Sequence, residues 1–437
     1  MPGGYLPHTE RDRRVMLEAV GARDVDELFA DLPSGLALAA APDLGPGLDE
    51  QSLARRLAEL AAASAGQSLV CFAGGGYYDR YVPAAERALL ARGEFLTAYT
   101  PYQPEVSQGT LQATFEFQTM ISELVGLPAA TAGLYDGSTA LAEAALMARA
   151  ATGRGTVVAA PGVHPEWLEV VGTYGQGHGL HVATAAGPGD AAGTPDVAAV
   201  VVQQPDYFGR VADVRPWFEA RPRGALAIAA VNPATLGVLE APGALGADIA
   251  VGEGQSVGLP LSYGGPYLGF IAARSELLRR LPGRICGRTA DAAGRTAFVL
   301  TLQAREQHIR RAKATSNVCT NQALCALAVT IYLSLLGPQG LRRLGEVCLA
   351  RAHYLAHRLR AVPGAALAFP DAPFFDEFAL RVGDAPRVIR GLAARGYLVG
   401  PAVGAETVLV AVTEKRSRAE LDGLAAALRE VLGDARS

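Results

Sequence analysis

The pattern of apolar and polar positions changes twice along the 437-residue chain. Residues 10–20, 24–30 and 49–65 carry apolar side chains three or four positions apart, a spacing typical of amphipathic helices. Two prolines and neighbouring glycines at 42–47 mark a joint between the second and third of these helices. The pattern predicts a helical N-terminal segment over residues 1–65.

From about residue 132 the pattern becomes one of short, continuous apolar runs. A helix is expected over residues 138–151, capped by Asp136 or Ser138. The runs that follow have the length of strands buried on both faces, and helical or turn segments separate them. This alternation predicts an α/β fold with a parallel-rich sheet, in a large domain over residues 66–335. The expected strands cover residues 156–160, 180–184, 197–203, 225–231, 247–251 and 267–273.

The last part of the chain predicts a small C-terminal α+β domain over residues 336–437. Mostly helical sequence is expected over 305–336, and a second, long helix over 340–362. Strands and helices then alternate, with strands at 375–382 and 407–413 and helices at 386–395 and 417–432.

Composition excludes several classes of protein. The net charge is −4 with both signs mixed, so no nucleic-acid surface is expected. No apolar run approaches the roughly 18 residues of a membrane span, and the first residues lack the apolar core of a signal peptide. The five cysteines form no CxxC pair and predict reduced thiols in a cytoplasmic protein. His178 and His181 lack acidic partners at ligand spacing, so no metal site is predicted.

Lysine is nearly absent from the chain. Of 39 basic residues, only Lys313 and Lys415 are lysines. A side-chain amine is the group that forms a Schiff base with a carbonyl cofactor. Only these two positions could therefore form a Schiff base.

Five blocks of sequence carry a family resemblance. The most specific is FLTAYTPYQPEVSQGTLQATFEFQTMISELVGL, which contains a TPYQPEVSQG hallmark and resembles the glycine decarboxylase P-protein of the glycine cleavage system. The other blocks agree and follow the family's order, so the resemblance covers most of the chain. They are GGGYYDRYVP (74–83), LYDGSTALAEA (134–144), residues 246–270 and residues 302–324.

The resemblance implies a pyridoxal-phosphate-dependent transferase fold of the aspartate-aminotransferase type (fold type I). It also implies the α subunit, subunit 1, of the two-chain form, which assembles with a β subunit as α2β2. With that partner the enzyme decarboxylates glycine through pyridoxal phosphate and transfers the aminomethyl group to the lipoyl arm of the H-protein. Glycine, the β subunit and the lipoylated H-protein are the expected partners.

In the family's second half, a His-Lys-Thr turn followed by a glycine-rich loop binds the cofactor. Here the corresponding turn is Gly254-Gln255-Ser256, so the lysine is lost. Pyridoxal phosphate is therefore expected on the β subunit and not on this chain. Together with Ser138 and Thr139 at the start of the 138–151 helix, Gln255 and Ser256 are expected to form a vestigial cofactor site. Such a site could be filled by a side chain or could retain an anion pocket.

The segment TAYTPYQPEVSQG (97–109) supplies the candidates for an active-site role. Two prolines predict a rigid, exposed loop with polar tips, because proline restricts its neighbours to extended shapes. One interpretation is a turn in a dimer contact, capped by Glu105 or Ser107; the other is one wall of the partner's active site. The candidates are Tyr99, Thr100, Tyr102, Gln103, Glu105, Ser107 and Gln108.

Two other functions stay open. A self-sufficient pyridoxal-phosphate enzyme could use Lys313, whose pKa the neighbouring arginines would lower. A non-catalytic scaffold on a degenerate enzyme fold would need no amine. The cofactor absorbance of the isolated chain distinguishes the self-sufficient enzyme from the subunit and from the scaffold. A band of polar residues near Lys313 is a network at an interface or a substrate contact: Arg310, Arg311, Asn317, Cys319 and Asn321.

Overall fold

The computed structural model describes residues 7–33, 35–36, 42–96 and 100–433. The chain divides into two compact units, Met1–Gln67 and Ser68–Ser437. None of the residues described in the first unit is buried. Its helix α1 starts at a capping box between Thr9 and Asp12, as the spacing of these residues favours. The elements are α1 (Glu10–Val20), η1 (Asp26–Phe29) and α2 (Glu50–Ala62), with η2 (Ala65–Ser68) at the boundary.

The second unit is built on a seven-stranded sheet with the order β2-β8-β7-β6-β5-β3-β4. The five strands from β3 to β7 are parallel, whereas β8 is antiparallel to β7 and β2 is antiparallel to β8. The predicted parallel-rich sheet is therefore confirmed. The strands are β2 (Ala129–Ala130), β3 (Thr156–Ala159), β4 (His181–Thr184), β5 (Val197–Gln204), β6 (Leu226–Val231), β7 (Ile249–Glu253) and β8 (Gly269–Ala273).

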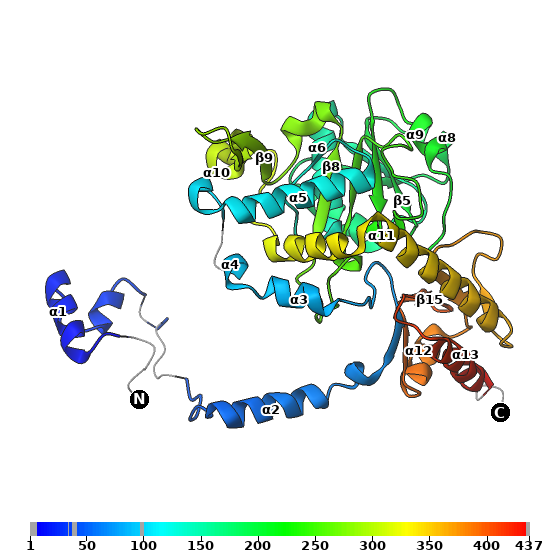
Figure 1. Ribbon diagram of the computed structural model, residues 1–437, viewed down its shortest axis with the longest axis horizontal. Coiled ribbons are helices and arrows are strands. Elements are labelled where there is room, and N and C mark those ends of the chain that lie inside the picture. Colours follow the sequence, from blue (N-terminus) through cyan, green and yellow to red (C-terminus); the bar gives the residue numbers. More distant parts are fainter. Residues whose placement is uncertain (1–6, 34, 37–41, 97–99, 434–437) are drawn as a thin grey trace. The chain divides into compact units, whose positions relative to one another are not determined.

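Helices cover both faces of this sheet. Along β6, Ala227 and Ala229 pack in the core with α5 and α11, while Ile228 and Ala230 pack on the opposite side with α6 and α7. Every residue of β6, β7 and β8 is buried, which explains their unbroken apolar pattern. Figure 1 shows α5 and α11 crossing one face. The helices are α3 (Ala84–Leu90), α4 (Gly93–Leu96), α5 (Gln108–Val125), α6 (Gly137–Thr152), α7 (Pro165–Gln176), α8 (Pro188–Gly193) and α9 (Arg215–Glu219).

Helix α11 (Ala323–Arg360) joins the sheet to the C-terminal part of the chain. The sequence predicted two helices here, and the structure confirms a break between them, because Gly337 (φ 61°, ψ 178°) is non-helical and precedes Pro338. Among the described residues, α11 is the one helix long and apolar enough to cross a membrane. Its side chains include Val329 and Leu355, which pack in two of the protein cores as those of a core helix do.

The predicted helical start at residue 305 is wrong. Only one helical turn and two 3-10 turns form there, and residues 314–322 contain no helix. Arg311 has a φ of 53°, which ends the helical path. The turns are η7 (Gln303–Arg305), α10 (Gln307–Arg310) and η8 (Arg311–Lys313).

The C-terminal part is an antiparallel sheet with the order β11-β12-β15-β14, flanked by α12, α13 and the end of α11. Strand β1, at the start of this unit, pairs in parallel with β13, so residues 70–73 belong to this part of the fold. The elements are β1 (Val70–Ala73), β11 (Ala366–Leu367), β12 (Glu377–Arg381), α12 (Ala385–Ala393), β13 (Tyr397–Gly400), β14 (Ala402–Val403), β15 (Thr407–Ala411) and α13 (Arg418–Gly433).

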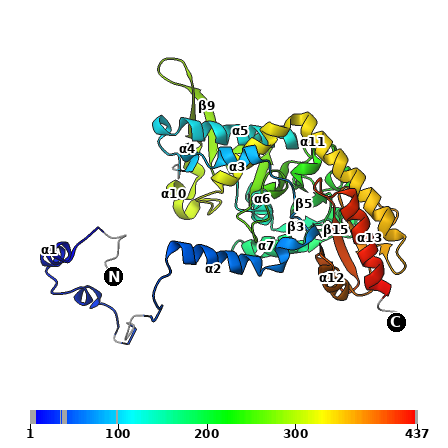
Figure 2. The same ribbon diagram turned by 60° about the horizontal axis from the view of Figure 1, so that its bottom comes forward.

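An antiparallel hairpin that the sequence did not predict lies beside α5. Strands β9 (Ile285–Ala290) and β10 (Thr296–Thr301) form it. Figure 2 shows the hairpin turn projecting away from the sheet. The remaining 3-10 turns are η3 (Pro104–Val106), η4 (Pro233–Thr235), η5 (Gly254–Ser256) and η6 (Ser275–Arg280).

Candidate functional site

A small cavity lies at the carboxyl ends of β5, β6 and β7, where open α/β sheets bind ligands. His164, Trp167, Asn232 and Glu253 form part of its wall. The space inside is about 30 Å³, enough for a water molecule. Ligand sites of proteins are typically about 300–1,000 Å³. The cavity is too small for a cofactor.

Glu253 occupies the end of α6 that faces this cavity. Its carboxyl group accepts backbone N–H bonds from Gly137 (2.9 Å), Gln255 (2.9 Å) and Leu268 (3.0 Å). Gly137 is the first residue of α6, where free N–H groups bind anions. Burial raises the pKa of Glu253 to about 7, against the effect of the three donors. The protein's own side chain thus fills an anion site.

The other residues of the expected cofactor site are bonded within the chain. Ser138 Oγ donates to Asp136 Oδ1 (2.5 Å). Asp136 caps α6, as predicted, by accepting from the N–H of Thr139, whose hydroxyl accepts from the N–H of Asp136. Ser256 Oγ donates to Asn232 Oδ1 (2.6 Å). These polar groups are therefore already paired.

Gln255 is fully buried, and its amide is bonded on both sides. Its Oε1 accepts from the N–H of Tyr78 (2.8 Å), and its Nε2 donates to the carbonyls of Tyr78 (2.9 Å) and Leu259 (2.8 Å). An amide has both the donor and the acceptor that this backbone requires, whereas the ammonium group of a lysine has no acceptor. Gln255 therefore holds the 74–83 segment against the end of β7.

Aromatic side chains fill the space beside the start of α6. A Cβ atom added to Gly137 would lie 2.4 Å from the ring of Trp167. The ring of His164 stacks on Trp167, with centroids 5.7 Å apart. Nε2 of His164 lies 3.0 Å from the carbonyl oxygen of Gly75, so this nitrogen carries the proton. Burial lowers the pKa of His164 and keeps the ring neutral.

Neither lysine lies at this cavity. Lys415 forms an ion pair with Asp79 (2.5 Å), and Lys313 is exposed on η8. No lysine amine lies at this cavity, Glu253 occupies the end of α6, and Trp167 packs against that end. The residues at the cavity therefore do not fit pyridoxal phosphate.

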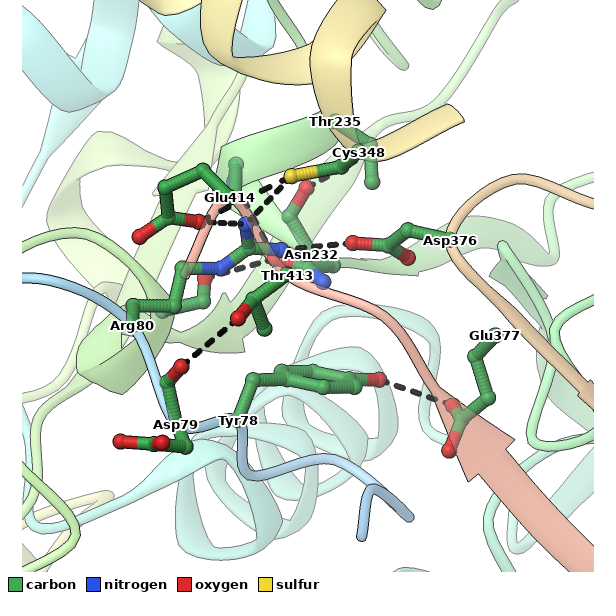
Figure 3. A network of polar contacts seen from close by, with 12 residues as sticks. Tyr78, Asp79, Arg80, Asn232, Thr235, Cys348, Asp376, Glu377, Thr413 and Glu414 are labelled. Carbon is green, nitrogen blue, oxygen red and sulfur yellow. Dashed lines mark hydrogen bonds and ion pairs between the residues drawn. The ribbon is translucent and has the colours of Figure 1, made fainter. Parts of the chain in front are cut away.

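Residues 74–83, the GGGYYDRYVP block, form a strap that joins the cavity to the C-terminal sheet. Gly75 N–H and Tyr78 O–H donate to the carboxyl oxygens of Glu377 at 2.7 and 3.0 Å. A Cβ atom at Gly74 would lie 2.0 Å from Glu377 Oε1, so only glycine fits there. Arg80, also on the strap, donates to Asp376 Oδ2 (2.6 Å). Figure 3 shows the contact of Tyr78 with Glu377 and that of Arg80 with Asp376.

Glu377 makes the stability of the protein depend on pH. Burial, with the nearby charge of Asp376, raises its pKa from 4.5 to about 8. Between these two values the unfolded chain loses a proton that the folded chain keeps, so stability falls as the pH rises through this window. Glu377→Gln keeps an acceptor for Gly75 and a donor toward Tyr78. Urea unfolding from about pH 5 to about pH 9 should therefore show a shallower loss of stability in this variant.

The exposed Glu219→Gln is the matched control and should keep the wild-type pH profile. If Glu377→Gln also keeps that profile, the titration of Glu377 does not contribute to it.

The 97–109 segment places its candidate residues in different environments. Tyr99 lies outside the described residues. Thr100 is half-buried, whereas Gln103 and Glu105 are exposed. Tyr102 is 46% exposed; its hydroxyl accepts from Arg284 Nη2 (3.3 Å), and its ring contacts the ring of His308, with centroids 5.7 Å apart.

Ser107 and Gln108 stand where α5 begins. Ser107 is the N-cap residue, but no side chain caps the helix, so the predicted cap is not formed. Gln108 Oε1 accepts from the N–H of Phe298 (2.9 Å), and its Nε2 donates to the carbonyls of Phe298 (2.9 Å) and Pro104 (2.7 Å). The amide of Gln108 is thus engaged on β10 of this chain.

A second glutamine of α5 bonds to the hairpin in the same way. Gln118 accepts from the N–H of Cys286 (2.8 Å) and donates to its carbonyl (3.0 Å) on β9. The two glutamines satisfy backbone groups on the outer edges of both strands, which would otherwise be unpaired. Sequence reasoning missed this role. The ten-residue spacing of Gln108 and Gln118 on a single helix was the available signal.

Comparison with known proteins identifies relatives of this chain along its whole length. The family model described as "Glycine cleavage system P-protein" matches residues 3–428. A protein of Desulforamulus reducens named "Probable glycine dehydrogenase (decarboxylating) subunit 1" is 49% identical over 97% of this chain and 99% of its own length. A protein of the same name from Moorella thermoacetica is 48% identical over 98% and 99%.

Solved structures agree with these relatives. A crystal structure of glycine decarboxylase (P-protein) of the glycine cleavage system, in inhibitor-bound form, is 47% identical, has a TM-score of 0.91, and covers 98% of this chain and 99% of its own. An aspartate aminotransferase from Thermus thermophilus, 20% identical, has a TM-score of 0.57 and covers 83% of this chain and 99% of its own. The predicted aspartate-aminotransferase type of fold is confirmed.

Proposed function

The chain belongs to the glycine cleavage system P-protein family, and on that premise we propose that it is subunit 1 of a two-subunit glycine dehydrogenase (decarboxylating). Together with a β subunit, it decarboxylates glycine and passes the aminomethyl group to the lipoyl arm of the H-protein. The assignment of this chain to the subunit that lacks the cofactor lysine rests on one observation. The turn after β7 holds the bonded amide of Gln255, and Glu253 fills the adjacent anion site.

Pyridoxal phosphate belongs, in this proposal, to the β subunit. When bound there, it supplies the electron sink for the decarboxylation. The contribution of this chain is structural support and a wall of the partner's site. The cavity of about 30 Å³ and the absence of an amine beside it support this division.

A permanent partner fits an apolar groove between α3, α4, α5 and α11. Leu89, Phe95, Ile331 and Leu335 line it, and Leu89 and Leu335 are exposed. Permanent interfaces are more apolar than transient ones. This groove supports a contact with the β subunit, in an α2β2 assembly. We place the complex in the cytoplasm, where the five free thiols stay reduced.

The 97–109 loop forms one wall of the partner's active site in this proposal. Its support is the exposure of Tyr102, Gln103 and Glu105, whose side chains are accessible to a partner. Tyr102→Ala should lower kcat/KM for glycine in the α/β complex by roughly ten- to a hundredfold through lost positioning. Steady-state kinetics of the purified complex measures this.

Tyr102→Phe distinguishes the contribution of the ring to kcat/KM from that of the hydroxyl. Tyr81→Ala, at an exposed tyrosine of the strap, is the matched control. Size-exclusion chromatography checks that each complex stays assembled. Wild-type kinetics for Tyr102→Ala would confine the loop to a structural role.

Reconstitution tests the proposed function itself. This chain, a β subunit and lipoylated H-protein are combined in all pairs and all together, and release of labelled CO₂ from glycine is measured. Release should require both subunits. Release by this chain without the β subunit would favour the enzyme that uses Lys313, and full activity of the β subunit alone would favour the scaffold.

A further inference from the structure

Three exposed cations within four residues have no ion-pair partner. Arg310, Arg311 and Lys313 form no ion pair with any residue that the structure describes. Some exposed basic residues elsewhere are paired within 4 Å, for example Arg342 with Glu346 (3.0 Å) and Lys415 with Asp79 (2.5 Å). Positive charge is therefore concentrated, and left uncompensated, at α10 and η8.

The backbone at these cations is strained. Arg311 has φ 53° and ψ −131°, a conformation that favours glycine. Leu302, at the start of the segment, is also left-handed, with φ 53°. Such a backbone conformation destabilises the folded state by about 1–3 kcal/mol, and conformations of this kind cluster at functional sites. A glycine at 311 would relieve the strain, but it would remove one of the three charges.

Beneath the cations lies a buried ion pair with poor geometry. Arg284 Nε and Glu306 Oε2 are 3.8 Å apart, too far for a hydrogen bond. Neither Arg284 Nε nor Glu306 Oε1 has a hydrogen-bond partner in the described structure. His308 Nδ1 also lies 3.8 Å from Glu306 Oε2. The segment is instead fixed one residue earlier, where Arg305 donates to the carbonyls of Leu281, Gly283 and Leu302.

Tyr102 joins the segment to the 100–106 loop, through its contacts with Arg284 and His308. Exposed apolar side chains stand on both elements: Val106 on η3 is 80% exposed and Ile309 on α10 is 52% exposed. The surface formed by the two elements, here termed the cationic face, therefore combines apolar contact area with positive charge. Its members are Tyr102, Val106, Ile309, Arg310, Arg311 and Lys313.

We propose that the cationic face docks a carboxylate-rich face of a protein that binds and leaves in every catalytic cycle, namely the lipoyl-bearing H-protein of the proposed function, on which this inference rests. Exposed unpaired charges accelerate association, whereas they contribute less to permanent interfaces. Besides the loop wall that holds Tyr102, the permanent partner has the apolar groove of Leu89 and Leu335, which shares no residue with the cationic face. The two surfaces thus suit two partners of different lifetime.

The test replaces all three cations by Arg310→Ser, Arg311→Gly and Lys313→Ser in the assembled α/β complex. A matched triple variant, Arg223→Ser, Arg279→Ser and Arg429→Ser, removes the same charge from exposed positions elsewhere. Binding of lipoylated H-protein is measured by calorimetry at low and at physiological ionic strength, alongside its KM in glycine decarboxylation.

The cationic-face variant should raise Kd and KM for the H-protein roughly tenfold at low ionic strength and lose most of the salt dependence. The matched variant should behave as the wild type. Equal Kd values and equal salt dependence in the two variants would overturn the docking surface, as would the absence of H-protein binding to the wild-type complex. If the wild type binds the H-protein at this face but releases no CO₂ from glycine, docking stands and the proposed function fails.

Discussion

Arg80→Ala should lower the free energy of unfolding by about 3–5 kcal/mol, because it leaves buried acids without their cation. Arg80 is almost fully buried and forms ion pairs with Asp376 (2.6 Å) and Glu414 (3.0 Å). Its Nη1 also donates to the sulfur of Cys348 (3.1 Å). These contacts fasten the strap to one end of the β12–β15 pair, where the start of β12 lies beside the end of β15 (Figure 3). Unfolding in urea, followed by circular dichroism, measures the loss.

Two variants make this result specific. Arg87→Ala removes an exposed arginine seven residues along the chain and should change stability by less than about 0.5 kcal/mol. Adding Asp376→Leu to Arg80→Ala removes one of the stranded acids and should recover part of the loss. If Arg80→Ala is no more harmful than Arg87→Ala, the network does not hold the strap.

Gln255→Leu should cost about 2–6 kcal/mol, because an apolar side chain bonds to none of the backbone groups that the amide satisfies. The change leaves the N–H of Tyr78 and the carbonyl of Leu259 without partners in a buried place, whereas the carbonyl of Tyr78 still accepts from the N–H of Arg80 (2.9 Å). Each such group costs about 1–3 kcal/mol. The midpoint of urea unfolding measures the effect, with the exposed Gln176→Leu as control.

Gln255→Lys sharpens the same point. A lysine at this position restores the amine but not the space, because Glu253 and Trp167 still occupy the site. We expect it to be destabilised like Gln255→Leu and to bind no cofactor. A stable Gln255→Lys protein that takes up pyridoxal phosphate would show that loss of the lysine alone had disabled the site.

Much of the fold could be predicted from the sequence because its strongest elements are locally encoded. The apolar runs of β5 and β6 show no alternation because both faces of the sheet are covered. The start of α6 is set by Asp136 and Thr139, three residues apart. The missing lysine at Gln255 was also readable, because the chain has only two lysines.

What the sequence did not predict depends on contacts between distant segments. The β9–β10 hairpin exists against α5, where Gln108 and Gln118 bond to residues 168 to 190 positions away. The helix expected from residue 305 fails at the strained Arg311, where local propensity does not decide the backbone. No local pattern showed that Glu377 closes on the glycines of the strap, 302 residues earlier.

The candidate site was predicted unevenly for the same reason. The sequence located the turn at Gln255, but only the structure shows that Glu253 fills the anion site and that Gln108 bonds to its own chain. Polar side chains in a loop such as 100–108 have two kinds of partner available, the backbone nearby and another molecule. The partner of each one is decided by three-dimensional packing.

The most direct measurement of the central claim is the cofactor absorbance of this chain, purified with pyridoxal phosphate alone and in complex with the β subunit. Reductive trapping and peptide mapping locate any bound cofactor. We expect no cofactor band for the lone chain, and in the complex a band that maps to a lysine of the β subunit. A covalently bound cofactor on the lone chain, at Lys313 or Lys415, would contradict this expectation.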